Sequence, residues 1–270
     1  MVNAVSYWAT FNNVQLNTIP NLQIYSIMPY NPNRSLNILQ LARISARKLS
    51  SAFYDSRQIY ISLVINAGSR IALDQALDSL NAILQGTEQT LVISQSGTSR
   101  QYTATFAGPP TVNNPSVGDS GVAAPQGGYY DITLTFECSD SFGYDTVYTP
   151  IYNLANQSGG SLTYPYNQGG SADTQAPFIQ IQYTGGGLGA GTVVIGNQST
   201  GQAVSITRTW ALNDIIQINP QANTVQVNGV DTAFSGAIPF FGLGAQTIYY
   251  TDTMTTRLFK IFAYVYNKWV

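Results

Sequence analysis

Few side chains in this 270-residue sequence have the types and spacing needed for catalysis. The chain has no histidine, so a hydroxyl or thiol nucleophile would lack its usual activating base. The only lysines that could replace that base are Lys48, Lys260 and Lys268, and none lies in a nucleophile motif. Asp74 and Asp78 are spaced one helical turn apart, which is typical of a solvated helix face rather than of paired catalytic carboxylates. We therefore expect no enzymatic activity and no cofactor.

Metal and phosphate sites are equally poorly supported by the sequence. Cys138 is the only cysteine, and without histidine no zinc site of the usual Cys and His kind can form. We expect Cys138 to be a small buried side chain. The glycine-rich segment 185–191 is similar to a phosphate-binding loop, but it leads into a strand pattern rather than a helix. It predicts a turn, and no aspartate-rich loop has the spacing of a calcium site.

The composition indicates a folded protein with a weakly charged surface. Hydrophobic residues make up 44% of the chain, which is enough for a core, whereas charged residues make up only 9%. About 25% charged residues is usual in soluble domains. The net charge of −2 lacks the strong basic bias of a nucleic-acid-binding protein. A surface with so few charges resists self-association poorly, which favours a protein that works inside an assembly.

The sequence also bears on where the chain folds. Residues 1–13 lack the basic start and the continuous apolar run of a signal peptide. No stretch is long and apolar enough to predict a membrane span. We therefore expect folding and assembly in a cytoplasm, and we interpret the sequons at Asn156 and Asn197 as turns rather than glycosylation sites.

Only one stretch predicts a helix. Residues 58–66 alternate between apolar and polar side chains, which predicts a strand. Apolar residues then recur every three or four positions, which predicts an amphipathic helix near 71–85. Gly86 suits the helix C-terminus, and Ser69 and Asp74 are alternative N-caps. Because one helix cannot bury its apolar stripe alone, it must pack on a sheet.

The rest of the chain is predicted to be mainly strand. Segments 89–94 and 99–107 predict a hairpin, and residues 129–137 predict a further strand. Residues 35–49 fit either a basic helix or a bent strand, and the strand is favoured. Segment 108–128 is rich in Gly, Pro, Asn and Ser and lacks periodicity, so we expect it to become ordered only against a neighbour.

A change in composition predicts two domains. Residues 1–150 form the first, residues 151–176 a Gly- and Ser-rich linker, and residues 177–270 an all-β second domain. Short apolar or alternating runs recur in the second domain at the spacing of a sandwich or jelly roll. Asn228-Gly229 favours a type I′ hairpin turn.

The order of these features resembles the distal tail protein (Dit) family of long-tailed bacteriophages, which forms the baseplate or tail-tip hub. In the first half the resemblance rests on Arg57-Gln-Ile-Tyr-Ile-Ser-Leu-Val-Ile, Leu73-Asp-Gln-Ala-Leu-Asp-Ser-Leu, and Ile132-Thr-Leu-Thr-Phe-Glu-Cys-Ser-Asp before Phe142-Gly-Tyr. Family members often have a proline where this chain has Ser141. In the second half it rests on Val194-Ile-Gly-Asn-Gln-Ser-Thr-Gly-Gln-Ala-Val-Ser-Ile, Asn213-Asp-Ile-Ile-Gln-Ile-Asn and Thr224-Val-Gln-Val-Asn-Gly.

The resemblance implies a mainly β fold and a structural role at the virion tail tip. The first domain would be a small tail-tube-like β-barrel with one flanking helix, and the second a galectin-like β-sandwich. Six copies would form a ring around the channel for the genome, without sequence-specific nucleic-acid binding. The ring would join the tail-tube protein to the tail-associated hub or fibre protein, and in some relatives to receptor-binding proteins. The sugar site of galectins is not carried over, because this chain has no His and no Glu after Glu137.

Two sets of residues are candidates for interactions. Arg43, Arg47 and Lys48 could form a basic face for tube docking or a subunit interface, or they could be a solvated charge run. Trp210 could be exposed and stack on a carbohydrate, or it could be a buried sandwich tryptophan. Two alternative functions stay open: a carbohydrate-binding module for host attachment, and the tail-tube protein itself.

Overall fold

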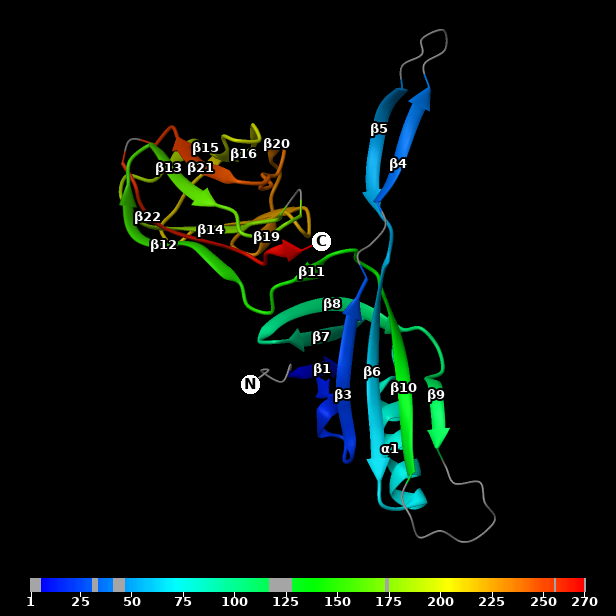
Figure 1. Cartoon of the computed structure of the whole chain (residues 1–270). Helices are drawn as coiled ribbons and strands as arrows, with labels where there is room; N and C mark the ends of the chain where they lie inside the picture. Colours follow the sequence, from blue (N-terminus) through cyan, green and yellow to red (C-terminus); the bar gives the residue numbers. More distant parts are fainter. Residues whose placement is uncertain are drawn as a thin grey trace, which may run out of the picture. The chain divides into compact units, whose positions relative to one another are not determined.

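The computed structural model describes residues 6–30, 34–40, 47–116, 128–172, 175–254 and 256–269. The chain divides into two compact units, the first ending at Thr146 and the second beginning at Val147 (Figure 1). Strands dominate both units, and the described residues contain one α-helix. The prediction of a mainly β chain with one helix is confirmed.

The first unit is built on one antiparallel sheet. Its elements are β1 (Tyr7–Phe11), β2 (Val14–Gln15), η1 (Leu16–Thr18), β3 (Leu22–Pro29), β4 (Arg34–Gln40), β5 (Arg47–Tyr54), β6 (Arg57–Ala67), α1 (Arg70–Ile83), β7 (Gln89–Gln95), β8 (Thr98–Phe106), β9 (Thr111–Ser116), β10 (Gly128–Cys138) and β11 (Gly143–Tyr144). The sheet has the order β2-β1-β7-β8-β10-β6-β3, while β9 extends along β10 and β11 pairs with β8. Strands β4 and β5 form a separate two-stranded sheet.

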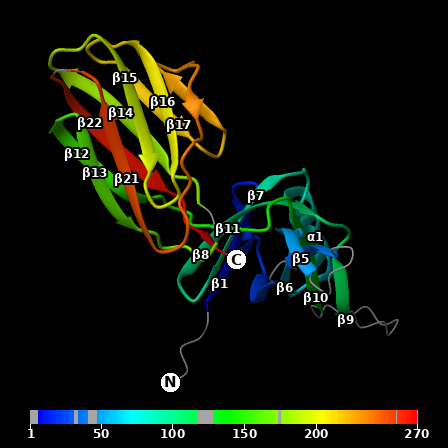
Figure 2. The same ribbon diagram turned by 90° about the horizontal axis from the view of Figure 1, so that it is seen from above.

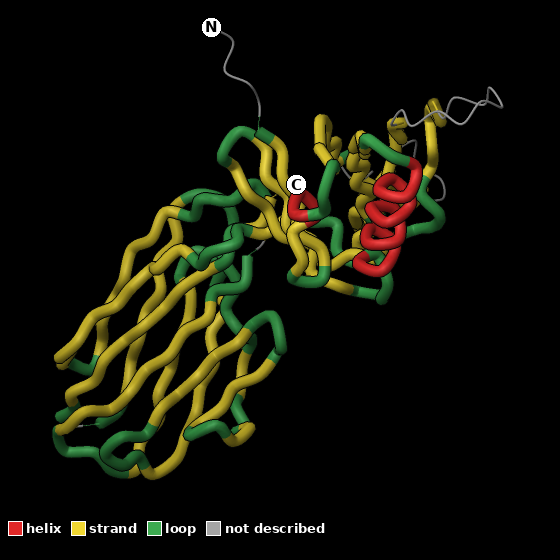
Figure 3. Tube along the Cα trace, turned by 90° about the horizontal axis from the view of Figure 1, so that it is seen from below, coloured by secondary structure: helices red, strands yellow, loops and turns green. Residues whose placement is uncertain are grey.

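Helix α1 lies against the sheet, where it contacts β6 and β10 (Figure 3). Its N-cap is Ser69, whose Oγ accepts a hydrogen bond from the Ala72 amide at 3.2 Å. The helix buries Leu73, Ala76 and Leu80 against the sheet. Strand β6 alternates strictly, so every second side chain joins the same core. The predicted amphipathic helix and its partner strand are confirmed within two residues at each end.

The second unit consists of two antiparallel sheets (Figure 2). Its strands are β12 (Thr149–Ser158), β13 (Ser161–Asn167), β14 (Phe178–Gly185), β15 (Ala190–Asn197), β16 (Gln202–Thr209), β17 (Ile215–Asn219), β18 (Thr224–Val227), β19 (Val230–Asp231), β20 (Ser235–Gly236), β21 (Ala245–Asp252), β22 (Leu258–Val265) and β23 (Lys268–Trp269). The six-stranded sheet runs β12-β22-β14-β17-β18-β19, and the five-stranded sheet runs β13-β21-β15-β16-β20.

The inner faces of these two sheets share one hydrophobic core. Tyr183 on β14 and Tyr250 on β21 are fully buried. Their hydroxyls lie 3.0 Å apart and form a hydrogen bond with each other across the core, so neither is left without a partner. Asn228 and Gly229 both have positive φ, at 55° and 77°, and they connect β18 to β19. The predicted hairpin turn at these two residues is confirmed.

Three segments differ from the sequence-based expectations or refine them. Residues 151–176 are not a plain linker, because β12 and β13 occupy most of them and pair with β22 and β21. Both are edge strands with mostly exposed side chains, so they lack the apolar pattern that marks a strand in sequence. Residues 34–40 and 47–54 are strands, as favoured. Strand β9 lies within the expected irregular segment 108–128, of which residues 117–127 are outside the described part of the chain.

Candidate functional site

Besides the two-residue strand β2 at one end of the strand order, two longer strands of the main sheet have a single strand partner. Strand β3 pairs only with β6, and β9 pairs only with β10, among the strands that the structure describes. Each therefore presents a row of backbone N–H and C=O groups without a strand partner. Tyr25 and Met28 on β3 are 45% and 53% exposed, so the β3 edge also carries apolar side chains at the surface.

The face of this sheet opposite α1 is polar and carries few charges. On β10 its side chains are Asp131, Thr133, Thr135 and Glu137, which alternate with buried residues. Across the sheet, the Tyr25 hydroxyl donates to Asp131 Oδ1 at 2.6 Å. This bond to a carboxylate raises the pKa of Tyr25. The bond ties the edge strand β3 to β10 over the intervening strand β6.

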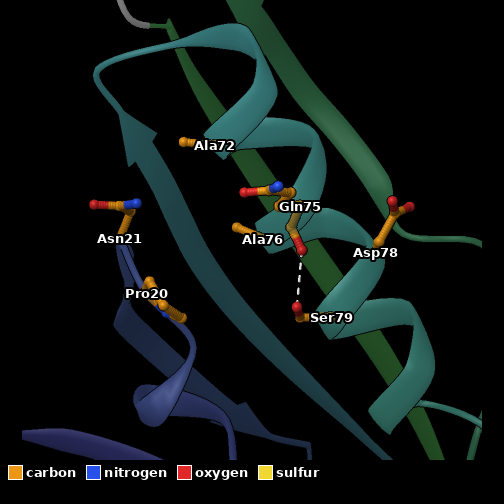
Figure 4. A pocket seen from close by; sticks show the side chains of 7 residues that line it. All are labelled: Pro20, Asn21, Ala72, Gln75, Ala76, Asp78 and Ser79. Atoms are coloured by element: carbon orange, nitrogen blue, oxygen red, sulfur yellow. Dashed lines mark hydrogen bonds between the residues drawn. The ribbon is translucent and has the colours of Figure 1, made fainter.

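A hollow of about 450 Å³ lies between α1 and the start of β3 (Figure 4). One wall is formed by Pro20 and Asn21, and the other by α1. The helix contributes Ala72, Gln75, Ala76, Asp78 and Ser79. Ser79 Oγ donates to the Gln75 carbonyl at 2.8 Å, so its hydroxyl is engaged within the helix. These side chains are mostly small and uncharged, so the hollow could accommodate a group of matching shape but contains no catalytic group.

No group of three or more His, Cys, Asp or Glu side chains that could hold a metal ion occurs among the described residues. Cys138 is buried, as predicted, with 1% of its surface exposed. Burial raises the pKa of its thiol to about 12, so the side chain stays protonated at neutral pH. No helix in the described part of the chain is long and apolar enough to cross a membrane.

Trp210 is buried, with 2% of its surface exposed. Its indole Nε1 donates to the Gly191 carbonyl at 3.0 Å, and its ring lies 5.5 Å from that of Tyr183. A ring enclosed in this way presents no free face to a sugar, so of the two interpretations the structure supports the core tryptophan.

Asn197 is also buried, and its side-chain amide donates to the Phe240 carbonyl and to Gln246 Oε1 at 2.8 Å each.

The predicted basic face lies largely beyond what the structure describes. Arg43 falls outside the described residues. Arg47 and Lys48 open strand β5, where they pair in register with Gln40 and Leu39. Their role in docking therefore stays a prediction.

Arg57 is a buried charged residue that reasoning from the sequence missed. Arg57, at the start of β6, is only 3% exposed. Its guanidinium carbon lies 5.6 Å from the centre of the Tyr102 ring, and Nη1 donates to the Tyr102 hydroxyl at 3.3 Å. The signal was available, because extending the alternation of β6 back from Ile59 places Arg57 on the core face. Its Nε and Nη2 have no hydrogen-bond partner among the described residues, so the contacts with Tyr102 are the ones that hold the side chain.

Comparison with known proteins gives a match at the level of structure. No family model and no curated protein matches the sequence. The fold is similar to that of phage SPP1 Dit (gp 19.1), described as a paradigm of the hub adsorption apparatus in Gram-positive infecting phages. That match has 14% identity and a TM-score of 0.64 and covers 98% of this chain and 99% of the other. A chain of the phage P2 baseplate in its activated conformation with Ca matches with 13% identity and a TM-score of 0.49, over 99% and 98%. The chain thus has a Dit-like fold over nearly its whole length, and the resemblance seen in the sequence is confirmed in the fold.

Proposed function

We propose that this chain is a distal tail protein, a non-enzymatic structural component of a bacteriophage tail tip. The observation that carries the proposal is the similarity to SPP1 Dit, because it includes both units and 98% of the chain. A shared fold alone does not fix function. The weakly charged surface and the open sheet edges of the first unit are independent support, since both suit a protein that functions in an assembly.

We infer that six copies form a closed ring through their first units. The far edges of β3 and β9 lie at opposite sides of a short sheet, so the edge of one copy can pair with the other edge of the next. Such head-to-tail contacts generate a ring when the rotation closes. Ring closure removes the free edges and buries side chains such as Met28, at about 25 cal/mol per Å² of apolar surface.

The ring would act by its geometry. Its first units, as tail-tube-like barrels, would surround the channel through which the genome passes. One face would meet the last ring of the tail tube, and the other would meet the tail-associated hub or fibre protein. The second units, as galectin-like sandwiches, would point outward and could hold receptor-binding proteins. Arg43, Arg47 and Lys48 are the candidate docking face for the tube or a neighbouring subunit.

The tail-tube protein itself is the main alternative, because its subunit fold is related. Tube subunits stack in successive rings, so they would assemble into filaments of increasing length. The second unit favours the tail tip, since it makes up nearly half of the chain and is included in the match to SPP1 Dit. A closed assembly of one size distinguishes the tail-tip protein from the tube protein.

Mass photometry of the purified chain and of an edge variant tests the proposal. The wild type is expected to show a species of six times the 29.2 kDa chain mass. Met28→Lys places a charge on the exposed β3 edge and should shift this species toward the monomer. Leu212→Lys is the matched control, because Leu212 is 59% exposed in a loop of the second unit. A wild type that stays monomeric at micromolar concentration with tail-tube protein added would contradict the proposal.

A further inference from the structure

The outer face of the six-stranded sheet carries a row of amide side chains in register. Starting at β12, the directly paired residues across the sheet are Asn153, Phe262, Gln180, Gln217, Gln226 and Asp231. Gln217 Nε2 donates to Gln180 Oε1 at 3.2 Å, and Gln226 Nε2 donates to Asp231 Oδ1 at 2.9 Å. These two bonds hold neighbouring amides in fixed orientations and leave further donors and acceptors on each.

A cluster of aromatic rings lies beside this row, near the first residue of β14 and the last residues of β22. Tyr264 is at its centre, with ring centroids 4.9 Å from Phe178, 5.3 Å from Phe262, 4.8 Å from Tyr148 and 5.9 Å from Tyr266. Tyr148 and Tyr266 are 44% and 42% exposed, whereas the three other rings are partly covered by one another. The aromatic cluster is therefore a surface feature and not part of the buried core.

The dimensions of this face suit an extended ligand. Neighbouring strands of a sheet lie about 4.8 Å apart, so a row across six strands is roughly 25 Å long. On β14 and β22, Phe178 and Tyr264 lie two residues from the row members Gln180 and Phe262, or about 7 Å along the strand. An extended chain lying across the strands along the amide row would thus have aromatic rings beside it where it crosses β14 and β22.

We propose that this face binds an uncharged, extended polysaccharide. The apolar C–H faces of pyranose rings stack on aromatic rings, and vicinal hydroxyls need partners that both donate and accept, as glutamine amides do. At the described outward positions of these strands, the only charged side chains are Lys260 on β22 and Asp231 at the end of the row. Their opposite signs leave no net charge to select an anionic or cationic ligand. Exposed aromatic rings also occur at protein interfaces, and the assembly mass of the variants distinguishes that use from glycan binding.

This surface is separate from Trp210 and goes beyond the proposed tail-tip function. Trp210 is buried between the sheets, whereas the aromatic and amide rows lie on the outside of one sheet. A ring could form through the first units whether or not this face binds a glycan. If this face binds a glycan, the second unit would attach the assembly directly to a surface that carries that glycan.

Native affinity electrophoresis of the full chain tests this inference. The gels contain a neutral glucan, mannan, galactan or rhamnan, with polygalacturonate as the anionic comparison. We expect retardation by at least one neutral polysaccharide. Tyr264→Ala and Gln217→Ala should each lower the affinity for that polysaccharide roughly fivefold to tenfold. Tyr264→Phe should keep the wild-type affinity because the ring remains. Phe234→Ala is the matched control, since Phe234 is a 37% exposed aromatic of the same unit outside the two rows.

Three results would overturn the inference. One is the absence of retardation by every neutral polysaccharide. Another is equal retardation of wild type and Tyr264→Ala when both show the same thermal melting curve. The third is a change in assembly mass, without a change in retardation, for Tyr264→Ala and Gln217→Ala, because the face would then be a protein interface. An intact ring with a negative gel result would leave the proposed tail-tip function standing.

Discussion

At the scale of the residue, burial decides the chemistry of the ionisable side chains. Cys138 and Tyr164 have no charged partner that favours ionisation strongly enough to offset desolvation, and the pKa of each is raised to about 12. An unfolded chain loses the thiol proton near its ordinary pKa of 9.0, whereas the folded protein keeps it until about pH 12. The free energy of unfolding therefore falls as pH rises across this interval.

We predict that Cys138→Ala makes the protein less sensitive to alkali. Removing one such proton should reduce the decline in unfolding free energy by at most about 1.4 kcal/mol per pH unit. Urea unfolding of wild type and variant from pH 7 to 11 measures the two slopes. Any packing loss in the variant is the same at every pH, so only the slope is diagnostic. Parallel curves between pH 9 and 11 would show that the thiol does not ionise in this way.

The burial of individual residues could be predicted from the sequence only in part. The position of Cys138 in an apolar strand predicted its burial, and the result agrees. The side of the sheet that Arg57 faces could have been derived from the alternation of β6, but its charge argued for the surface. The aromatic cluster around Tyr264 could not be derived, because Phe178 reaches it only through the pairing of β14 with β22, and Tyr148 only because it directly precedes β12, which pairs with β22 as well.

At the scale of the element, helix α1 depends on its N-cap. We predict that Ser69→Ala destabilises the first unit by about 1 kcal/mol, because the Ala72 amide loses its acceptor. Ser79→Ala is the matched control, since the Ser79 hydroxyl bonds only to a carbonyl within the helix and its loss should change stability by less than about 0.5 kcal/mol. Thermal unfolding of both variants checks this. Equal losses for the two would mean that the cap does not limit the helix.

Elements with a buried side were predictable, and elements without one were not. Strand β6 and α1 each bury one face, so their periodicity was visible in the sequence. The edge strands β12 and β13 bury few side chains and contain Pro150 and Pro165, so their composition is similar to that of a linker. Their place in the sheets is set by pairing with β22 and β21, which are about 100 residues away in sequence.

At the scale of the whole molecule, the proposed function requires that one subunit repeats around a channel. The two-unit fold is similar to that of SPP1 Dit over nearly the whole chain, and the proposed tail-tip role is based on this similarity. The open edges of β3 and β9 are the feature that a ring would use. In the proposed ring, the residues at these edges would need to fit the neighbouring subunits.

The most direct measurement is negative-stain electron microscopy of the purified wild-type chain, with two-dimensional class averages. We expect closed rings of one diameter with sixfold symmetry, a central channel and peripheral lobes from the second unit. Filaments of variable length would identify a tube protein instead. Isolated single subunits, observed also after tail-tube protein is added, would contradict the proposal of a ring.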